Sequence, residues 1–294
     1  MLKGNQVLIV TPFESNYEVD ESSLVNLVDH LVEQDVAGII VLGTTGEFFS
    51  LQDHEKKRII DITSERIKDR TALIVGVAHS GSSISADMAR YAGEKGASAV
   101  LLPPPYYHVP TPEGMIDHFT IVGQRGNVDL MVYDGGGGIE VPIHVIEKAR
   151  AATSKLRYIK LTAPKVTKVR EYHEAFGSEV SVFAGEDLLI MPELLEGADG
   201  LTTAAGNLRP KELTEIFNLV QNEKFSEAQM IHDTHIAPQA IVTGSIRNEF
   251  IQCFKTSLKM MGIIKTDTVR PPLHRLSESR IQNLSLMLQN QKLI

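Results

Sequence analysis

Cysteine is almost absent from the sequence, because Cys253 is the single thiol among 294 residues. One thiol cannot form an intramolecular disulfide, which argues against the disulfide-built domains of secreted proteins and favours the reducing cytoplasm. Cys253 lies in an apolar segment with helical spacing. We therefore expect a small buried hydrophobic residue at this position rather than a nucleophile.

Long apolar runs and basic runs are also missing. No stretch reaches the roughly 18 consecutive apolar residues that a membrane-spanning helix requires. The formal net charge is −8, and an acidic chain without clusters of lysine or arginine is poorly suited to bind nucleic acid or an anionic membrane. With 43% hydrophobic and 22% charged residues, the composition predicts an ordinary soluble globular protein.

Short apolar segments alternate with helical patterns over the first 221 residues. The predicted strands cover residues 6–10, 38–42, 72–77, 99–102, 129–132, 156–160, 180–183 and 200–203. The predicted helices cover residues 21–34, 52–67, 83–95, 112–124, 142–151, 167–176, 188–195 and 210–221. Eight such units predict an α/β fold, a closed (β/α)8 TIM barrel of parallel strands. The alternative is an open doubly wound sheet, but no G-x-G-x-x-G sequence follows the first strand to support it.

The alternation ends near residue 224. Three helical patterns, 225–242, 245–260 and 276–289, then follow one another with no strand between them. This tail is too small to form a core of its own. We therefore divide the chain into a barrel over residues 1–223, which carries the active site, and a C-terminal helical domain over residues 224–294 that packs on the barrel.

A lysine, Lys160, ends the sixth predicted strand. Lysine is almost never fully buried unless a partner engages it. One interpretation is an ion pair that caps the strand. The other is a desolvated, neutral amine, which is the form that attacks a carbonyl to make a Schiff base. The strand alone leaves both interpretations open.

The second predicted strand ends in Gly43-Thr44-Thr45-Gly46. In a barrel, chemistry takes place at the C-terminal ends of the strands. Two hydroxyl residues between glycines allow backbone N–H groups and side chains to converge on an anion. A tight turn with a threonine helix cap would have the same sequence, so this segment is only suggestive by itself.

Three other strand ends carry candidate residues. Three prolines stiffen the loop that presents Tyr107, which is either a reactive phenol or an aromatic contact at the barrel rim. Tyr133 follows the fifth predicted strand, where a phenol can relay a proton or hold a substrate oxygen. Small residues, including Gly185 and Thr203, end the seventh and eighth strands and leave room for a ligand.

Two further clusters are given structural interpretations. Glu186 and Asp187 could form a catalytic acid pair, but the start of the seventh helix is favoured for them, because acidic residues suit a helix N-terminus. His232 and His235 could bind a metal, but no third ligand lies at a useful spacing. We therefore expect a solvated helix face there and no metal site.

Together these segments resemble the dihydrodipicolinate synthase/N-acetylneuraminate lyase family of pyruvate-dependent class I aldolases. The matching segments run in order over essentially the whole chain: Thr11-Pro12-Phe13, Gly43-Thr44-Thr45-Gly46-Glu47, Pro105-Tyr106-Tyr107, Tyr133-Asp134, Ile159-Lys160 and Val269-Arg270-Pro271-Pro272-Leu273. No single segment is decisive, but the combination is highly specific.

The resemblance implies a role for each matching residue. Lys160 would be the Schiff-base lysine, and Tyr133 would be the acid/base phenol above it. Thr44 would link Tyr133 to Tyr107, which a neighbouring subunit of a homotetramer built from dimers would donate. Thr45 and the backbone of its turn would hold the pyruvate carboxylate. Neither a metal nor an organic cofactor would be needed, because the lysine serves as the electron sink once the imine forms.

One departure from the family bears on the second substrate. The synthases follow the tyrosine after strand five with an arginine that grips this substrate's carboxylate, whereas residues 133–140 here contain no cation. Asp134 would moreover repel the carboxylate of aspartate semialdehyde. The alternatives are therefore an aldolase or hydrolyase for 2-keto-3-deoxy sugar acids or N-acetylneuraminate, or a non-catalytic 2-oxo acid binder. The intact set of Lys160, Tyr133 and Tyr107 speaks against the binder.

Overall fold

Eight parallel strands close into a barrel in the computed structural model, which describes residues 1–244 and 249–294. The strands are β1 (Gly4–Leu8), β2 (Gly38–Val41), β3 (Ala72–Gly76), β4 (Ala99–Leu102), β5 (Leu130–Asp134), β6 (Leu156–Leu161), β7 (Ser181–Ala184) and β8 (Gly200–Leu201). Each strand pairs with its sequence neighbours, and β8 pairs with β1. The predicted (β/α)8 barrel is confirmed.

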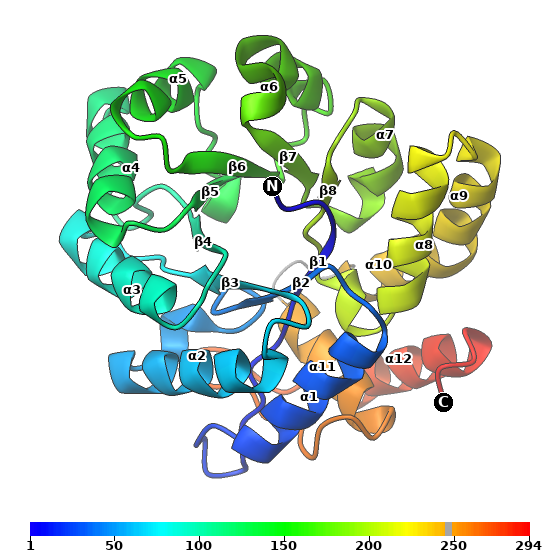
Figure 1. The fold of residues 1–294 in the computed structure, drawn as a ribbon. Coiled ribbons are helices and arrows are strands. Elements are labelled where there is room, and N and C mark those ends of the chain that lie inside the picture. Colours follow the sequence, from blue (N-terminus) through cyan, green and yellow to red (C-terminus); the bar gives the residue numbers. More distant parts are fainter. Residues whose placement is uncertain (245–248) are drawn as a thin grey trace.

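Helices surround the barrel, as Figure 1 shows. They are α1 (Glu21–Glu33), α2 (Asp53–Ile67), α3 (Ser82–Glu94), α4 (Pro112–Gly126), α5 (Ile143–Ala152), α6 (Lys168–Phe176), α7 (Ile190–Leu195) and α8 (Pro210–Gln221). The sequence explains them locally. In α1, Leu24, Leu27 and Leu31 form the buried stripe, and the Asp20 side chain caps the helix by accepting a 2.9 Å hydrogen bond from the Ser23 backbone.

The core has two layers, because parallel strands are covered on both faces. Inside the barrel lies a cluster of buried side chains: Leu8, Ile40, Ile74, Ala99, Leu101, Met131, Tyr158 and Phe183. The alternate residues of the strands pack outward against the apolar stripes of the helices in a second, larger cluster. The centre of the barrel is therefore filled, and space for a ligand remains only at its ends.

Two strand boundaries differ from the predictions in ways that affect the site. β5 runs to Asp134 instead of ending at residue 132, so Tyr133 lies within the strand. β8 ends at Leu201, and α7 begins at Ile190 after a single 3₁₀ turn that contains Asp187.

The C-terminal helices are more broken than the sequence pattern predicts. The first predicted helix consists of α9 (Phe225–Ile231), a π-helical turn over His232–Ile236, and α10 (Ala237–Gly244). Pro238 has no N–H for the carbonyl of Thr234 one turn earlier, and the side chain of Gln291 donates to that carbonyl instead, at 3.0 Å. The other two helices are α11 (Phe250–Met260) and α12 (Glu278–Asn290), while the predicted start at residue 245 lies outside the described residues.

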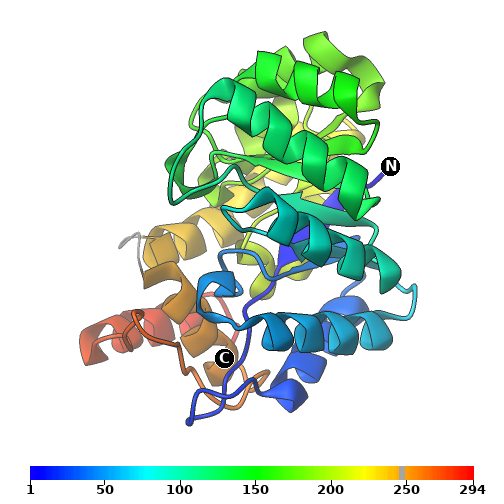
Figure 2. The ribbon, with the colours of Figure 1, turned by 90° about the vertical axis from the view of Figure 1, so that its left-hand side faces the viewer.

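Figure 2 places the N-terminus on one side of the barrel and α10, α11 and α12 on the other. Arg209, at the start of α8, ties the tail back by donating to the backbone carbonyl of Gln291 at 2.7 Å. The division of the chain at residue 223/224 stays a prediction.

Across the described part of the chain, no helix combines the length and apolarity needed to cross a bilayer. Cys253 is buried as expected, and burial raises the pKa of its thiol to about 11.

Candidate active site

A cavity of about 960 Å³ opens at the carboxyl ends of the strands. Five of the residues predicted to take part in catalysis or substrate binding line it: Thr44, Thr45, Tyr133, Lys160 and Gly185. They come from β5, β6 and the segments that follow β2 and β7. The sequence therefore located the cavity, although these residues are up to 141 positions apart in the chain (185 − 44).

Lys160 is held in the wall of this cavity with 4% of its surface exposed. β5 and β6 pair Tyr133 directly with Lys160, so both side chains point to the same side of the sheet. The amine lies 4.1 Å from the centre of the Tyr133 ring. Among residues 1–244 and 249–294, no carboxylate forms an ion pair with Lys160, so the strand-capping interpretation finds no support.

Gly185 makes the space that the lysine occupies. A Cβ atom at this position would lie 2.4 Å from the carbonyl oxygen of Leu161 and 3.0 Å from Cε of Lys160. Any larger residue would push either the β6 backbone or the lysine side chain out of place. Glycine at the end of β7 therefore leaves room for the Lys160 side chain at the end of β6.

The turn after β2 presents Thr44 and Thr45 to the cavity. Its backbone is closed by bonds from Gly46 N–H to the Gly43 carbonyl (3.1 Å) and from Glu47 N–H to the Thr44 carbonyl (3.0 Å). Gly43 and Gly46 pack against the barrel wall, where Cβ atoms would lie 2.9 Å from Leu8 Cδ2 and 3.2 Å from the Ile9 carbonyl oxygen. The two glycines therefore shape the turn, and the two threonines face the ligand space.

Two predicted site residues lie elsewhere within one chain. Tyr107 is 92% exposed on the loop after β4, where its backbone N–H donates to Ser80 Oγ at 3.3 Å. Thr203 is buried next to the carboxylate of Asp187. A single subunit therefore does not bring Tyr107 to the lysine.

Glu186 and Asp187 line the cavity and also begin the turn that leads into α7. Burial and the neighbouring charge of Glu186 raise the pKa of Asp187 to about 6, although Lys160 opposes the shift. The expected helix start is therefore wrong in detail, because these residues precede α7 by a 3₁₀ turn, and it left out their place in the cavity wall. Their position at the end of a barrel strand was the signal for a second role.

Asp134 does not face the cavity, and the expected repulsion of a substrate carboxylate is wrong. Its carboxylate is fully buried on the outer side of β5 and forms a 2.6 Å ion pair with Lys168. Tyr172 donates to the same oxygen at 2.7 Å, and the backbone N–H of Val141 donates to the other oxygen at 2.7 Å. Burial and the Asp134 charge raise the pKa of Tyr172 far above its usual range. Asp134 thus fixes α6 to the barrel.

The four glycines after Asp134 form an ordered turn in the cavity wall. Gly135, Gly137 and Gly138 have φ values of 91°, 65° and 82°, which favour glycine. Gly135 N–H donates to Ile139 and Gly138 N–H donates to Gly135, both at 3.0 Å, so these two amides are not free to bind an anion. Lys160 is the single lysine or arginine lining the described part of the cavity.

Sequence reasoning missed the cavity wall contributed by the C-terminal helices. Ala240, Ile241 and Thr243 of α10 line the cavity, as do Phe250 and Phe254 of α11. No local pattern places these helices over the mouth of the barrel, because their position is set by tertiary packing.

The histidine cluster was also misjudged. His232 is buried instead of solvated, and its ring nitrogen lies 3.3 Å from the backbone carbonyl of Asp187. His232 therefore links the π-helical turn to the cavity wall. Within the described ranges, no group of three or more His, Cys, Asp or Glu residues is placed to hold a metal ion.

The model of the dihydrodipicolinate synthetase family matches residues 1–291. The chain belongs to this family. The 4-hydroxy-tetrahydrodipicolinate synthase of Trichlorobacter lovleyi is 31% identical over 300 residues, with 100% of both chains covered. The enzyme of the same name from Protochlamydia amoebophila is 28% identical over 295 residues, covering 98% of this chain and 96% of the other. These relatives confirm the predicted class, a lyase or synthase of this family.

Solved structures agree with this assignment. The dihydrodipicolinate synthase of Thermotoga maritima is 27% identical, with a TM-score of 0.93 and 100% of both chains covered. The chloride-inhibited dihydrodipicolinate synthase of Acinetobacter baumannii, solved in complex with pyruvate, is 26% identical with the same TM-score and coverage.

Proposed function

We propose that this enzyme activates pyruvate, or a closely related 2-oxo acid, as an imine on Lys160. One observation carries the proposal: a buried lysine without a carboxylate partner in the described structure lies against Tyr133, in the same cavity as the Thr44–Thr45 turn. The pyruvate that occupies the Acinetobacter baumannii relative supports the choice of 2-oxo acid.

The steps follow from the groups in the cavity. The neutral amine of Lys160 attacks the ketone carbon, and the carbinolamine loses water to form a protonated imine. Removal of a methyl proton gives an enamine, which attacks the carbonyl carbon of an aldehyde; cleavage is the reverse. Tyr133 is the proton carrier for these steps, because its phenol lines the same cavity beside the amine. Thr45 and the backbone of its turn, apart from the Gly46 N–H that already donates to Gly43, hold the carboxylate of the 2-oxo acid.

Borohydride reduction tests this proposal. With pyruvate present, a lactyl-type mass should appear on the peptide that contains Lys160 and on no other peptide. Lys160→Arg should abolish the adduct, because a guanidinium stays protonated at working pH. A label on another lysine, or none, would overturn the assignment.

The oligomer completes the site in this proposal. Tyr107 and its exposed neighbours Phe49 (45%) and Tyr106 (42%) form an aromatic rim, in which the Phe48 ring links Phe49 and Tyr106 by edge-to-face contacts. An aromatic rim of this kind suits a subunit contact. Across it, Tyr107 reaches the neighbouring subunit's site and joins Thr44 and Tyr133 in a proton relay. The assembly is a homotetramer built from such dimers, and the single buried thiol supports a location in the cytoplasm.

The aldehyde is the point on which two candidates differ. The names of the relatives favour condensation to 4-hydroxy-tetrahydrodipicolinate. The cavity wall favours cleavage of a 2-keto-3-deoxy sugar acid, because its described part carries Glu186 and Asp187 and no cation besides Lys160. Carboxylates accept hydrogen bonds from sugar hydroxyls and repel a second carboxylate.

A further inference from the structure

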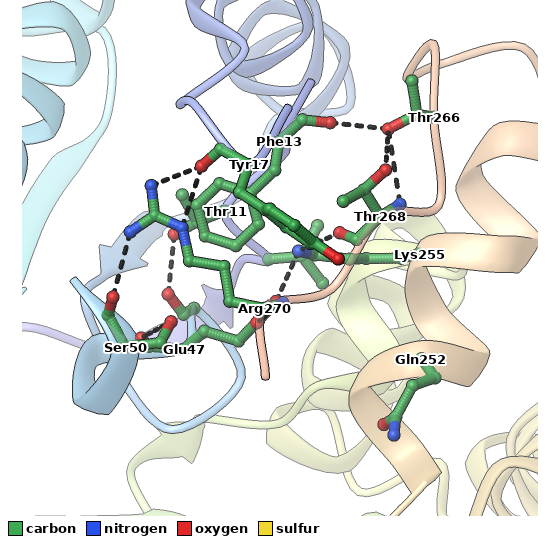
Figure 3. A network of polar contacts seen from close by, with 12 residues as sticks. Thr11, Phe13, Tyr17, Glu47, Ser50, Gln252, Lys255, Thr266, Thr268 and Arg270 are labelled. Atoms are coloured by element: carbon green, nitrogen blue, oxygen red, sulfur yellow. Dashed lines mark hydrogen bonds and ion pairs between the residues drawn. The ribbon is translucent and has the colours of Figure 1, made fainter. Parts of the chain in front are cut away.

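An ion pair between Glu47 and Lys255 is buried completely, with neither side chain exposed at all. It joins the turn after β2 to α11, as Figure 3 shows. Taking two charges out of water costs several kcal/mol per ion, and apolar replacements are often as stable or more so. Stability alone therefore gives a weak reason for this pair, and its position suggests another.

Glu47 is the last residue of the turn that contains Thr44, Thr45 and Gly46. Its φ of 55° is in the left-handed region, which is uncommon for a residue other than glycine. Its backbone N–H closes the turn on Thr44, as described above. Its side chain accepts a 3.0 Å hydrogen bond from the backbone N–H of Arg270. The position of the Glu47 carboxylate is therefore mechanically tied to the two threonines.

Lys255 supplies the charge that holds this carboxylate. Besides Glu47, its amine donates to the carbonyl of Thr268 at 2.8 Å and lies 4.0 Å from the centre of the Phe13 ring. Burial lowers the pKa of Lys255 to about 8, and the attraction of Glu47 opposes this shift. The neighbouring residue on α11, Phe254, lines the cavity. The same helix thus contacts the cavity and secures the turn.

Arg270 fastens the surrounding loops. Its guanidinium binds Glu55 of α2 at 2.8 Å, the carbonyl of Ser50 at 2.9 Å and the carbonyl of Tyr17 at 2.9 Å. The segments after β1 and β2 are thereby fixed to the C-terminal part of the chain (Figure 3). Within the barrel part of the described chain, two hydroxyl groups also hold the turn: Thr11 donates to the Gly46 carbonyl at 2.7 Å and Ser50 donates to the Glu47 carbonyl at 3.0 Å. Neither of these neutral donors carries the charge that Lys255 places against Glu47.

We propose that Lys255 is a positioning residue for the 2-oxo acid: through Glu47 it holds the Thr44–Thr45 turn in the shape that receives the carboxylate. This inference rests on the proposed function. It gives Lys255 of the C-terminal helical segment an indirect part in substrate binding. Because Lys255 acts on binding and not on imine chemistry, its loss should weaken pyruvate binding while Lys160 stays reactive.

The test is borohydride trapping as a function of pyruvate concentration, with Lys255→Met as the variant and Lys259→Met as the matched control. Lys259 lies one turn further along α11, has an exposed side chain and pairs with Asp267. We expect the half-saturating pyruvate concentration to rise about tenfold or more in Lys255→Met, the scale on which orienting groups act. Full labelling of Lys160 should return at saturation, and Lys259→Met should match the wild type.

Each other outcome is decisive. Half-saturation unchanged in folded Lys255→Met, even with reduced thermal stability, would overturn the positioning role. If Lys255→Met does not fold, Glu47→Gln decides in the same assay, because glutamine keeps an acceptor for Arg270 and loses the charge; unchanged half-saturation would again overturn the role. A wild type that traps no pyruvate on Lys160 would overturn the proposed function and this inference with it.

Discussion

Glu193 should make the free energy of unfolding depend on pH. The Glu193 side chain is fully buried in α7, with none of its surface exposed. Burial raises the pKa of Glu193 from 4.5 to about 8; a hydrogen bond from the backbone N–H of Gly185 opposes this shift, and the nearby charge of Glu186 adds to it. The folded protein therefore keeps a proton that the unfolded chain releases in mildly acidic solution.

The sign and size of the effect follow from this difference. Between the unfolded and folded pKa values the folded state binds more protons, so the free energy of unfolding falls as pH rises, by about 1.4 kcal/mol per pH unit. The contribution is fully present below the unfolded pKa and is lost as pH rises through the folded pKa. From pH 5.5 to 7.5, Glu193 should thus lower the free energy of unfolding by about 2–3 kcal/mol.

Urea unfolding of the wild type and Glu193→Gln at pH 5.5, 6.5 and 7.5 measures this directly. Glutamine cannot titrate, so the variant should gain about 2–3 kcal/mol relative to the wild type across this range. Glu227→Gln, on the exposed face of α9, is the control and should show a difference that does not vary with pH. A flat difference for Glu193→Gln would refute the reasoning, because it would mean that the carboxyl group is already ionised in the folded state.

Three further predictions concern the site. Gly185→Ala should lower kcat at least about tenfold, because the new Cβ would displace Lys160. Overpacking should lower the free energy of unfolding by only about 1–3 kcal/mol. Unchanged kcat in the folded variant would contradict this prediction. Mixed oligomers of Lys160→Ala and Tyr107→Phe subunits should regain activity that neither variant has alone, and failure in hybrids verified by mass would remove Tyr107 from the neighbour's site. With pyruvate and aspartate semialdehyde, kcat/KM should stay below about 10⁴ M⁻¹s⁻¹ and below the value for cleaving 2-keto-3-deoxy sugar acids. The reason is that the arginine with which the synthases bind the carboxylate of the aldehyde substrate is missing from residues 133–140, and losing such a charge-assisted hydrogen bond costs about 1.5–3 kcal/mol. A higher kcat/KM with aspartate semialdehyde would contradict this prediction.

The barrel and the inner half of the site could be predicted because their signals are local. The alternation of strands and helices defines the closed sheet, and a closed sheet brings all strand ends together. Lys160, Thr44 and Thr45 therefore line one cavity, although the sequence around each of them does not indicate the other two. The side-chain direction of Asp134 was equally accessible: in a strand that continues through Tyr133, the next residue must point to the opposite face.

The outer half of the site depends on packing between distant segments. Ile241 and Phe254 reach the cavity only because α10 and α11 fold back over the barrel mouth. The same packing buries His232 and pairs Lys255 with Glu47, 208 positions earlier in the chain (255 − 47). Periodicity identifies a helix and its apolar face, but it does not identify the surface that the face will cover.

The central claim is that Lys160 converts pyruvate to an enamine, and loss of the pyruvate methyl signal in heavy water tests it most directly. Enamine formation removes a methyl proton, so the wild type without any aldehyde should exchange these protons for deuterium, as followed by proton NMR. Lys160→Arg should show no exchange above the rate without enzyme, and Tyr133→Phe should exchange more slowly, about 10²-fold or more if the phenol carries the proton. Exchange at the wild-type rate in Lys160→Arg, or none in the wild type, would contradict the account.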